Sequence, residues 1–153
     1  LVYIFFGFAK KEEPAPAEPV VTIPETPLPI TEQLCFSRSQ IATETEPYEV
    51  SEHLSLSILG SVVTGTKSGT QAGPDMTNGF EGTLSGTRTG DDLELVFAYT
   101  IEGSENKELE LYTIFSDRLE KHRYVLKEEG GMLVPDLSSE VSVITYQAKS
   151  CEE

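Results

Sequence analysis

The sequence lacks tryptophan, and its 153 residues include only two cysteines, two histidines and two methionines. Histidines and cysteines so few and so far apart do not offer the ligand spacing of a zinc site. Basic residues are also scarce, since 11 Lys and Arg stand against 26 Asp and Glu and give a formal net charge of −15. Such a surface repels phosphates, so nucleic acid is not expected as a partner.

No apolar run is long enough to cross a bilayer as a helix, which takes about 20 residues. The longest run, LVYIFFGFA at residues 1–9, precedes Lys10 and Lys11. It resembles a signal-peptide remnant, with Gly7 and Ala9 at the small positions of a cleavage site. A buried first strand is the alternative. We expect an exported protein of the periplasm or cell envelope, with any membrane attachment through this segment only.

Proline is concentrated in one segment, because six of the nine prolines lie between Pro14 and Pro29. Proline fixes φ and lacks an N–H, so this stretch favours an extended, hydrated chain. We predict a disordered linker over residues 10–34 and one domain over residues 35–153. We expect the protein to be a monomer.

Helical periodicity is absent from windows of 11 or more residues, and alternation of polar and apolar residues takes its place. Period 2 places alternate residues in a core. The inward sets predicted for three segments are Val50, Leu54, Leu56 and Ile58; Leu93, Leu95, Phe97 and Tyr99; and Leu109, Leu111, Thr113 and Phe115. In the third segment, Glu108, Glu110, Tyr112 and Ile114 are then expected to face water.

Turn-forming residues separate the alternating segments, at Gly60, Asn78-Gly79, Gly90-Asp91, Gly103 and Gly130-Gly131. Strands that recur every 8–12 residues between such signals indicate an all-β fold. We predict an antiparallel meander of eight or nine strands that closes as a small lipocalin-like barrel or packs as a sandwich. Residues 119–127 are the one segment that could turn helical.

The two cysteines, Cys35 and Cys151, lie at opposite ends of the β region. In an exported protein this arrangement predicts a disulfide between the first and last strands, which are neighbours in a closed meander. Two unrelated buried thiols are the alternative. Acylation of Cys35 is rejected, because Gln33 and Leu34 precede it where small residues are required.

Three patterns come near to catalytic motifs. Residues 60–68, GSVVTGTKS, differ from a phosphate-binding loop by the inserted Thr66, and no helix follows. His53 and His122 are the only candidate imidazole bases, and both are expected at the surface. Glu108 and Glu110 have the spacing of a glycosidase pair, although a solvated strand face explains them more simply. We therefore predict no enzyme, no cofactor and no metal site.

A basic segment interrupts the acidic chain between Asp117 and Lys127. Its charged and aromatic members are Arg118, Lys121, His122, Arg123, Tyr124 and Lys127. They could contact an anionic ligand at the mouth of a barrel, or they could balance the charge of the acidic strands and protect a sheet edge.

Several short motifs resemble those of small uncharacterised periplasmic lipoproteins of the Bacteroidota type. They are Cys35-Phe36, LSLSILGSVVTGT at residues 54–66, FEGTLSGTRTGDDLELVFAYTIEGSENKELEL at residues 80–111, and the closing Cys151. The resemblance implies a periplasmic β-barrel-like domain tied by a disulfide, and it implies no activity.

These observations favour a non-catalytic binding module that holds a small apolar ligand or an envelope protein. An inhibitor of an envelope-degrading enzyme such as lysozyme is the alternative, because an acidic surface suits a basic target.

Overall fold

The computed structural model describes residues 30–45, 47–74, 77–101 and 103–151. These residues form ten strands and contain no helix. The strands are β1 Thr31–Gln40, β2 Glu49–Leu59, β3 Val62–Ala72, β4 Thr77–Thr89, β5 Asp92–Ile101, β6 Ser104–Ile114, β7 Arg118–Arg123, β8 Leu126–Glu129, β9 Met132–Pro135 and β10 Ser142–Lys149. The all-β prediction is confirmed.

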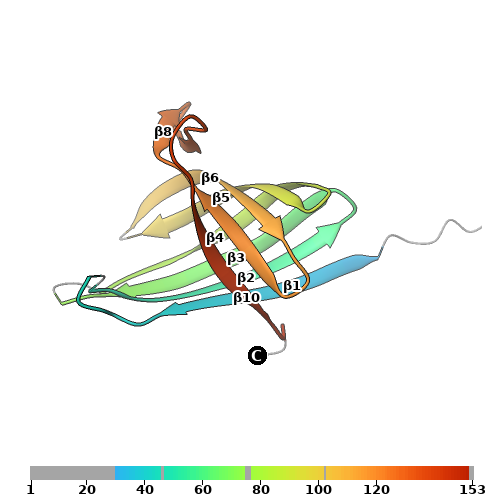
Figure 1. Ribbon diagram of the computed structural model, residues 1–153. Helices are drawn as coiled ribbons and strands as arrows, with labels where there is room; N and C mark the ends of the chain where they lie inside the picture. Colours follow the sequence, from blue (N-terminus) through green and yellow to red (C-terminus); the bar gives the residue numbers. More distant parts are fainter. Residues whose placement is uncertain (1–29, 46, 75–76, 102, 152–153) are drawn as a thin grey trace, which may run out of the picture.

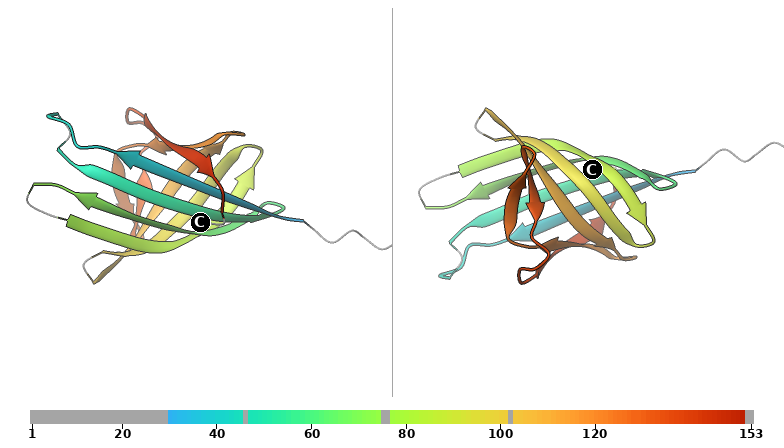
Figure 2. Two further views of the ribbon diagram at one scale, coloured as in Figure 1. Left: turned by 90° about the horizontal axis from the view of Figure 1, so that it is seen from below. Right: turned by 90° about the horizontal axis from the view of Figure 1, so that it is seen from above.

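Eight of these strands close into an antiparallel barrel. Each of β1 to β6 pairs with the next strand, β7 pairs with β6 and β10, and β10 returns to β1. Figure 2 views the barrel from opposite sides, with the blue and green strands β1 to β3 nearest in one view and the yellow β5 and β6 nearest in the other. The meander thus closes as a barrel, and the sandwich alternative is wrong.

The remaining strands, β8 and β9, form a hairpin in the connection between β7 and β10, and this hairpin projects from the barrel (Figure 1). It is tied to the wall by a parallel bridge between Glu108 of β6 and Leu133 of β9. The pairing of β6 with β7 ends at Leu111 and His122, so β9 covers an edge of β6 that β7 leaves open. The hairpin therefore completes the wall at one end of the barrel.

Two local predictions are corrected. The segment 119–127 contains the end of β7 and the start of β8 rather than a helix, because β7 continues to Arg123 and pairs on both sides. Asn78-Gly79 is not a turn but lies within β4, whose eleven-residue pairing with β3 overrides the local turn preference. At the true turns the glycines have positive φ, as at Gly90, which joins β4 to β5 with a φ of 63°.

The barrel interior is apolar over one half of its length. The apolar core there consists of Phe36, Leu54, Leu56, Ile58, Val63, Leu84, Leu93, Leu95, Phe97, Tyr112, Leu119 and Tyr146. The inward faces predicted for β2 and β5 are confirmed, because Leu54, Leu56, Leu93 and Leu95 are all buried. Burial of this core is the main source of stability for a barrel that has no second layer.

The first and last strands meet where β1 pairs with β10, and there Cys35 is disulfide-bonded to Cys151 with their Cα atoms 5.1 Å apart. The segments predicted at residues 1–9 and 10–29 lie outside the described residues. β1 begins at Thr31, so the last four positions of the expected linker, 31–34, belong to the first strand of the barrel.

Replacement of Phe97 by alanine should cost about 3 kcal/mol of unfolding free energy. Its ring is buried against those of Phe80 and Tyr99, at centroid distances of 5.9 and 4.6 Å. Val96→Ala, on the outer face of the same strand, should cost about 1 kcal/mol. Urea melts of the two variants measure the difference, and a costlier Val96→Ala would contradict the assigned face of β5.

Candidate ligand-binding site

Charged side chains occupy inward positions on three strands of the barrel. Lys67 of β3 lies on the same face as buried Val63, and Lys121 of β7 lies on the same face as buried Leu119. Glu110 of β6 also points inward, and only 2% of its surface is exposed. The core therefore gives way to an enclosed polar layer partway along the barrel.

The predicted inward face of β6 is wrong, because Glu110 and Tyr112 are buried while Leu109 and Leu111 are only half-buried on the outside. Burying one carboxylate costs several kcal/mol unless it is paired and hydrogen-bonded. Two lysines on other strands supply that pairing, and isolated leucines are tolerated on an outer surface. Glu110 therefore does not belong to a solvated acidic face.

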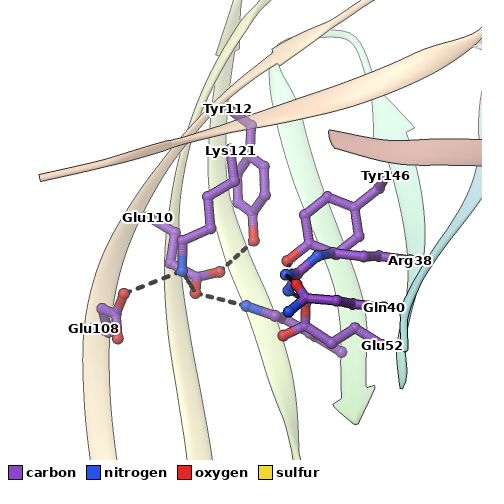
Figure 3. Close-up of polar contacts among 9 residues, drawn as sticks. Arg38, Gln40, Glu52, Glu108, Glu110, Tyr112, Lys121 and Tyr146 are labelled. Carbon is purple, nitrogen blue, oxygen red and sulfur yellow. Dashed lines mark hydrogen bonds and ion pairs between the residues drawn. The ribbon is translucent and has the colours of Figure 1, made fainter. Parts of the chain in front are cut away.

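We refer to Lys67, Glu110, Tyr112 and Lys121 as the buried cluster, and Figure 3 labels the last three of these residues. The Nζ atom of Lys67 donates to Oε1 of Glu110 at 2.7 Å, and Lys121 donates to the same oxygen. The hydroxyl of Tyr112 donates to Oε2. Both carboxylate oxygens thus have partners, and no buried polar side-chain atom within the described residues lacks one.

Burial and charge act in opposite directions on the pKa values of the buried cluster. Burial lowers the pKa of Lys67 despite the attraction of Glu110. For Glu110, burial alone would raise the pKa, but Lys121 and Lys67 together outweigh it and leave the pKa lowered. Burial also raises the pKa of Tyr112 well above its usual value, and the charge of Glu110 adds to that rise. The cluster is therefore built around an ionised carboxylate and a neutral tyrosine.

Two further ion pairs lie beside the buried cluster, and we call them the cavity ion pairs. Arg38 of β1 bonds Glu52 of β2 at 3.1 Å, and the hydroxyl of Tyr146 donates to the same Glu52 oxygen at 2.9 Å. On the other side, Lys121 bonds Glu108 of β6 at 3.2 Å. Figure 3 shows both pairs directed toward the interior from different walls of the barrel.

The cavity ion pairs form the polar part of a cavity of about 630 Å³ in the half of the barrel that the core leaves open. Apolar side chains, among them Val50, Phe80 and Ile144, line other parts of its wall. The β1–β2 connection contributes Pro47 and Tyr48, and the β8–β9 hairpin closes part of the rim. The volume is within the usual range of about 300–1,000 Å³ for small-molecule sites.

The cavity divides the predicted basic segment. Lys121 points inward, whereas Arg118 pairs with Glu120 and Lys127 pairs with Glu129 on the exterior. His122, Arg123 and Tyr124 contribute to the cavity wall. The predicted charge balance is thus confirmed for Arg118 and Lys127, whereas contact of the other basic residues with an anionic ligand stays a prediction.

The predicted histidines have different surroundings. His53 is exposed, as predicted. His122 is half-buried, with Nε2 at 2.9 Å from the hydroxyl of Thr113, which itself donates to Asp92 at 2.9 Å. In a catalytic triad the histidine lies between the acid and the nucleophile, but here the hydroxyl holds the middle position. The arrangement therefore lacks the order that activates a nucleophile.

The segment GSVVTGTKS at residues 60–68 forms the turn after β2 and the first part of β3. Its lysine, Lys67, binds Glu110 inside the barrel, so the segment is not a phosphate loop. Sequence reasoning missed Lys67, Arg38 and Glu52 as parts of one site. Each of the three is a charged residue at a position of its strand whose side chain points into the barrel. This pattern identifies a shared site only after the pairing of distant strands is known.

The chain matches no protein-family model, and no curated protein is significantly similar to it. Within residues 30–45, 47–74, 77–101 and 103–151, His, Cys, Asp and Glu side chains form no group of three or more that could hold a metal ion. The same part of the chain contains no helix with the length and apolar character of a membrane span.

Proposed function

We propose that this protein is a non-catalytic binding module of the cell envelope that holds one small ligand in the open half of its barrel. The observation that carries the proposal is the cavity of about 630 Å³. An eight-strand barrel has room for filling side chains or for one small ligand. Here the side chains fill only one half, and the ligand would occupy the other.

The chemistry of the wall supports binding rather than catalysis. The four charged groups of the cavity ion pairs hold one another, which neutralises the base or acid that a reaction would need. Apolar walls beside polar groups are typical of sites that bury most of a ligand and orient it by a few contacts. A small ligand with a substantial apolar part fits this wall.

Two features support an envelope location. The apolar residues 1–9 carry the pattern of an export signal, and the disulfide between Cys35 and Cys151 is of the kind that persists in oxidising compartments. The resemblance to Bacteroidota-type periplasmic lipoproteins agrees with both. Inhibition of an envelope-degrading enzyme is the weaker candidate, because only the acidic net charge favours it.

The proposal is tested with N-phenyl-1-naphthylamine, an uncharged apolar probe whose fluorescence rises on burial. We expect saturable binding of one probe per chain. Ile144→Trp, which fills the cavity, should weaken binding about tenfold or more. Val143→Trp adds the same side chain at the neighbouring position, which is half-exposed on the outer face, and should leave binding unchanged. Failure to bind, or equal loss in both variants, would contradict a cavity site.

A further inference from the structure

The wall of the cavity presents both signs of charge from separate directions. Arg38 and Glu52 come from β1 and β2, whereas Lys121 and Glu108 come from β7 and β6. All four line the cavity, and each side chain is between 12% and 20% exposed. The Lys67–Glu110 pair, by comparison, is sealed from solvent. The cavity ion pairs are instead accessible to a ligand.

Three of the four groups, Glu52, Glu108 and Lys121, retain hydrogen-bonding capacity beyond their present partners, and Arg38 also donates to Oε1 of Gln40 at 2.6 Å. Glu52 accepts from Arg38 and Tyr146 through Oε2 alone, and Glu108 accepts from Lys121 through Oε1 alone. Lys121 uses two of its three ammonium protons. Within the described residues, therefore, an oxygen of each carboxylate and a proton of Lys121 are left for a ligand without breaking either pair.

The ion-paired polar layer carries no net charge, and Arg123, which also lines the cavity, is exposed to solvent and lies outside this layer. The layer contains three cations, Arg38, Lys67 and Lys121, and three carboxylates, Glu52, Glu108 and Glu110. In a partly desolvated site, a ligand with a net charge would leave that charge uncompensated. A ligand with one positive and one negative group keeps the balance, because each group can meet its opposite on the wall.

The apolar part of the wall completes the description of the ligand. Val50, Phe80 and Ile144 line the same cavity as the ion pairs, so one molecule can contact both kinds of surface. A hydrophobic side chain would pack on this part, while the charged ends bond to the polar layer. The volume accommodates a molecule larger than a single amino acid.

From these observations we infer that the ligand is a small zwitterion with an apolar side chain, a free amino acid or short peptide whose carboxylate meets Arg38 or Lys121 and whose ammonium group meets Glu52 or Glu108. The inference rests on the proposed function, because it names the ligand class of the same cavity.

The absence of tryptophan allows a direct test, since the fluorescence of a ligand indole has no background from protein tryptophan. Four probes are compared: the dipeptide Leu-Trp, its N-acetyl form, its C-terminal amide, and the form blocked at both ends. The free dipeptide should bind about tenfold or more tightly than each blocked form. Equal binding of the doubly blocked form would overturn the zwitterion inference.

Charge variants give a result that a folding defect does not mimic. Arg38→Gln leaves the site with an excess negative charge and should shift the preference toward the cationic amide. Glu52→Gln leaves an excess positive charge and should shift it toward the anionic N-acetyl form. Arg88→Gln, whose ion pair with Glu32 lies outside the cavity wall, should keep the wild-type order. Uniform weakening of all four probes by both cavity variants would contradict the inference.

The outcome separates the inference from the function on which it rests. If N-phenyl-1-naphthylamine binds in the cavity and the free dipeptide gains nothing over its blocked forms, the ligand class is wrong and the binding function stands. If neither probe binds, both are wrong.

Discussion

Replacement of Glu110 by alanine is expected to lower the unfolding free energy by about 3–5 kcal/mol. The variant would leave Lys67, which is 4% exposed, without its carboxylate partner, and it would leave the hydroxyl of Tyr112 without an acceptor. Lys121 would keep its ion pair with Glu108, so its charge would remain compensated. The loss arises because uncompensated charge remains buried, so it exceeds what the ion pairs themselves contribute. Urea denaturation measures it.

Glu94→Ala is the matched control, because Glu94 is exposed on the neighbouring strand β5, and it should change stability by less than about 0.5 kcal/mol. A double variant, Lys67→Met with Glu110→Leu, removes the buried charges together and should recover part of the loss. A cost below about 1 kcal/mol for Glu110→Ala would show that the carboxylate is not buried as described.

The same variant should change the acid stability of the protein. The pKa of Glu110 is lowered on folding, so its contribution is complete above the ordinary carboxyl range and is lost as the pH falls through the lowered value. Glu110→Ala should therefore remove part of the decline in stability that the wild type shows at acid pH. This difference is measured by repeating the melts between neutral and acid pH.

The barrel itself could be predicted because its signals are local. In β2 the alternation of Leu54, Leu56 and Ile58 with serine and histidine fixes the inward face from the strand alone. Glycines between strands, such as Gly60 and Gly90, mark turns wherever positive φ is required. The alternation of side chains and the turn residues together left only two all-β arrangements, a closed barrel or a sandwich. The pairing of β1 with β10 closes the barrel.

The polar layer could not be predicted, because its signals are not local. Residues 108–115 carry apolar side chains on both faces, so the alternation alone does not say which face is inside. The choice depends above all on Lys67, which is 43 residues from Glu110 on a strand that does not pair with β6, and also on Lys121, which lies opposite Tyr112 in the β6–β7 pairing. A carboxylate is stable inside only once those strands are in place.

Removal of the disulfide by the double substitution Cys35→Ala and Cys151→Ala is expected to cost about 4–5 kcal/mol, because the bond closes a loop with a sequence separation of 116 residues. The location adds to the effect. β1 and β10 pair over only three positions, from Cys35 to Ser37, whereas β1 and β2 pair over ten. The disulfide thus lies at the short seam where the first and last strands of the barrel pair.

The contribution of the disulfide can be separated from that of the β1–β10 strand pairing by comparing the wild type, under oxidising and reducing conditions, with the double variant. Urea melts of the reduced protein and of the double variant should agree, and both should fall below the oxidised protein by the stated amount. In hydrogen exchange, amides at the seam, such as those of Phe36 and Ala148, should lose more protection than amides of β3 and β4. Peptide mass spectrometry without reduction should recover Cys35 and Cys151 linked. Free thiols in exported protein, or a loss below about 1 kcal/mol, would mean that strand pairing, and not the disulfide, holds the barrel closed.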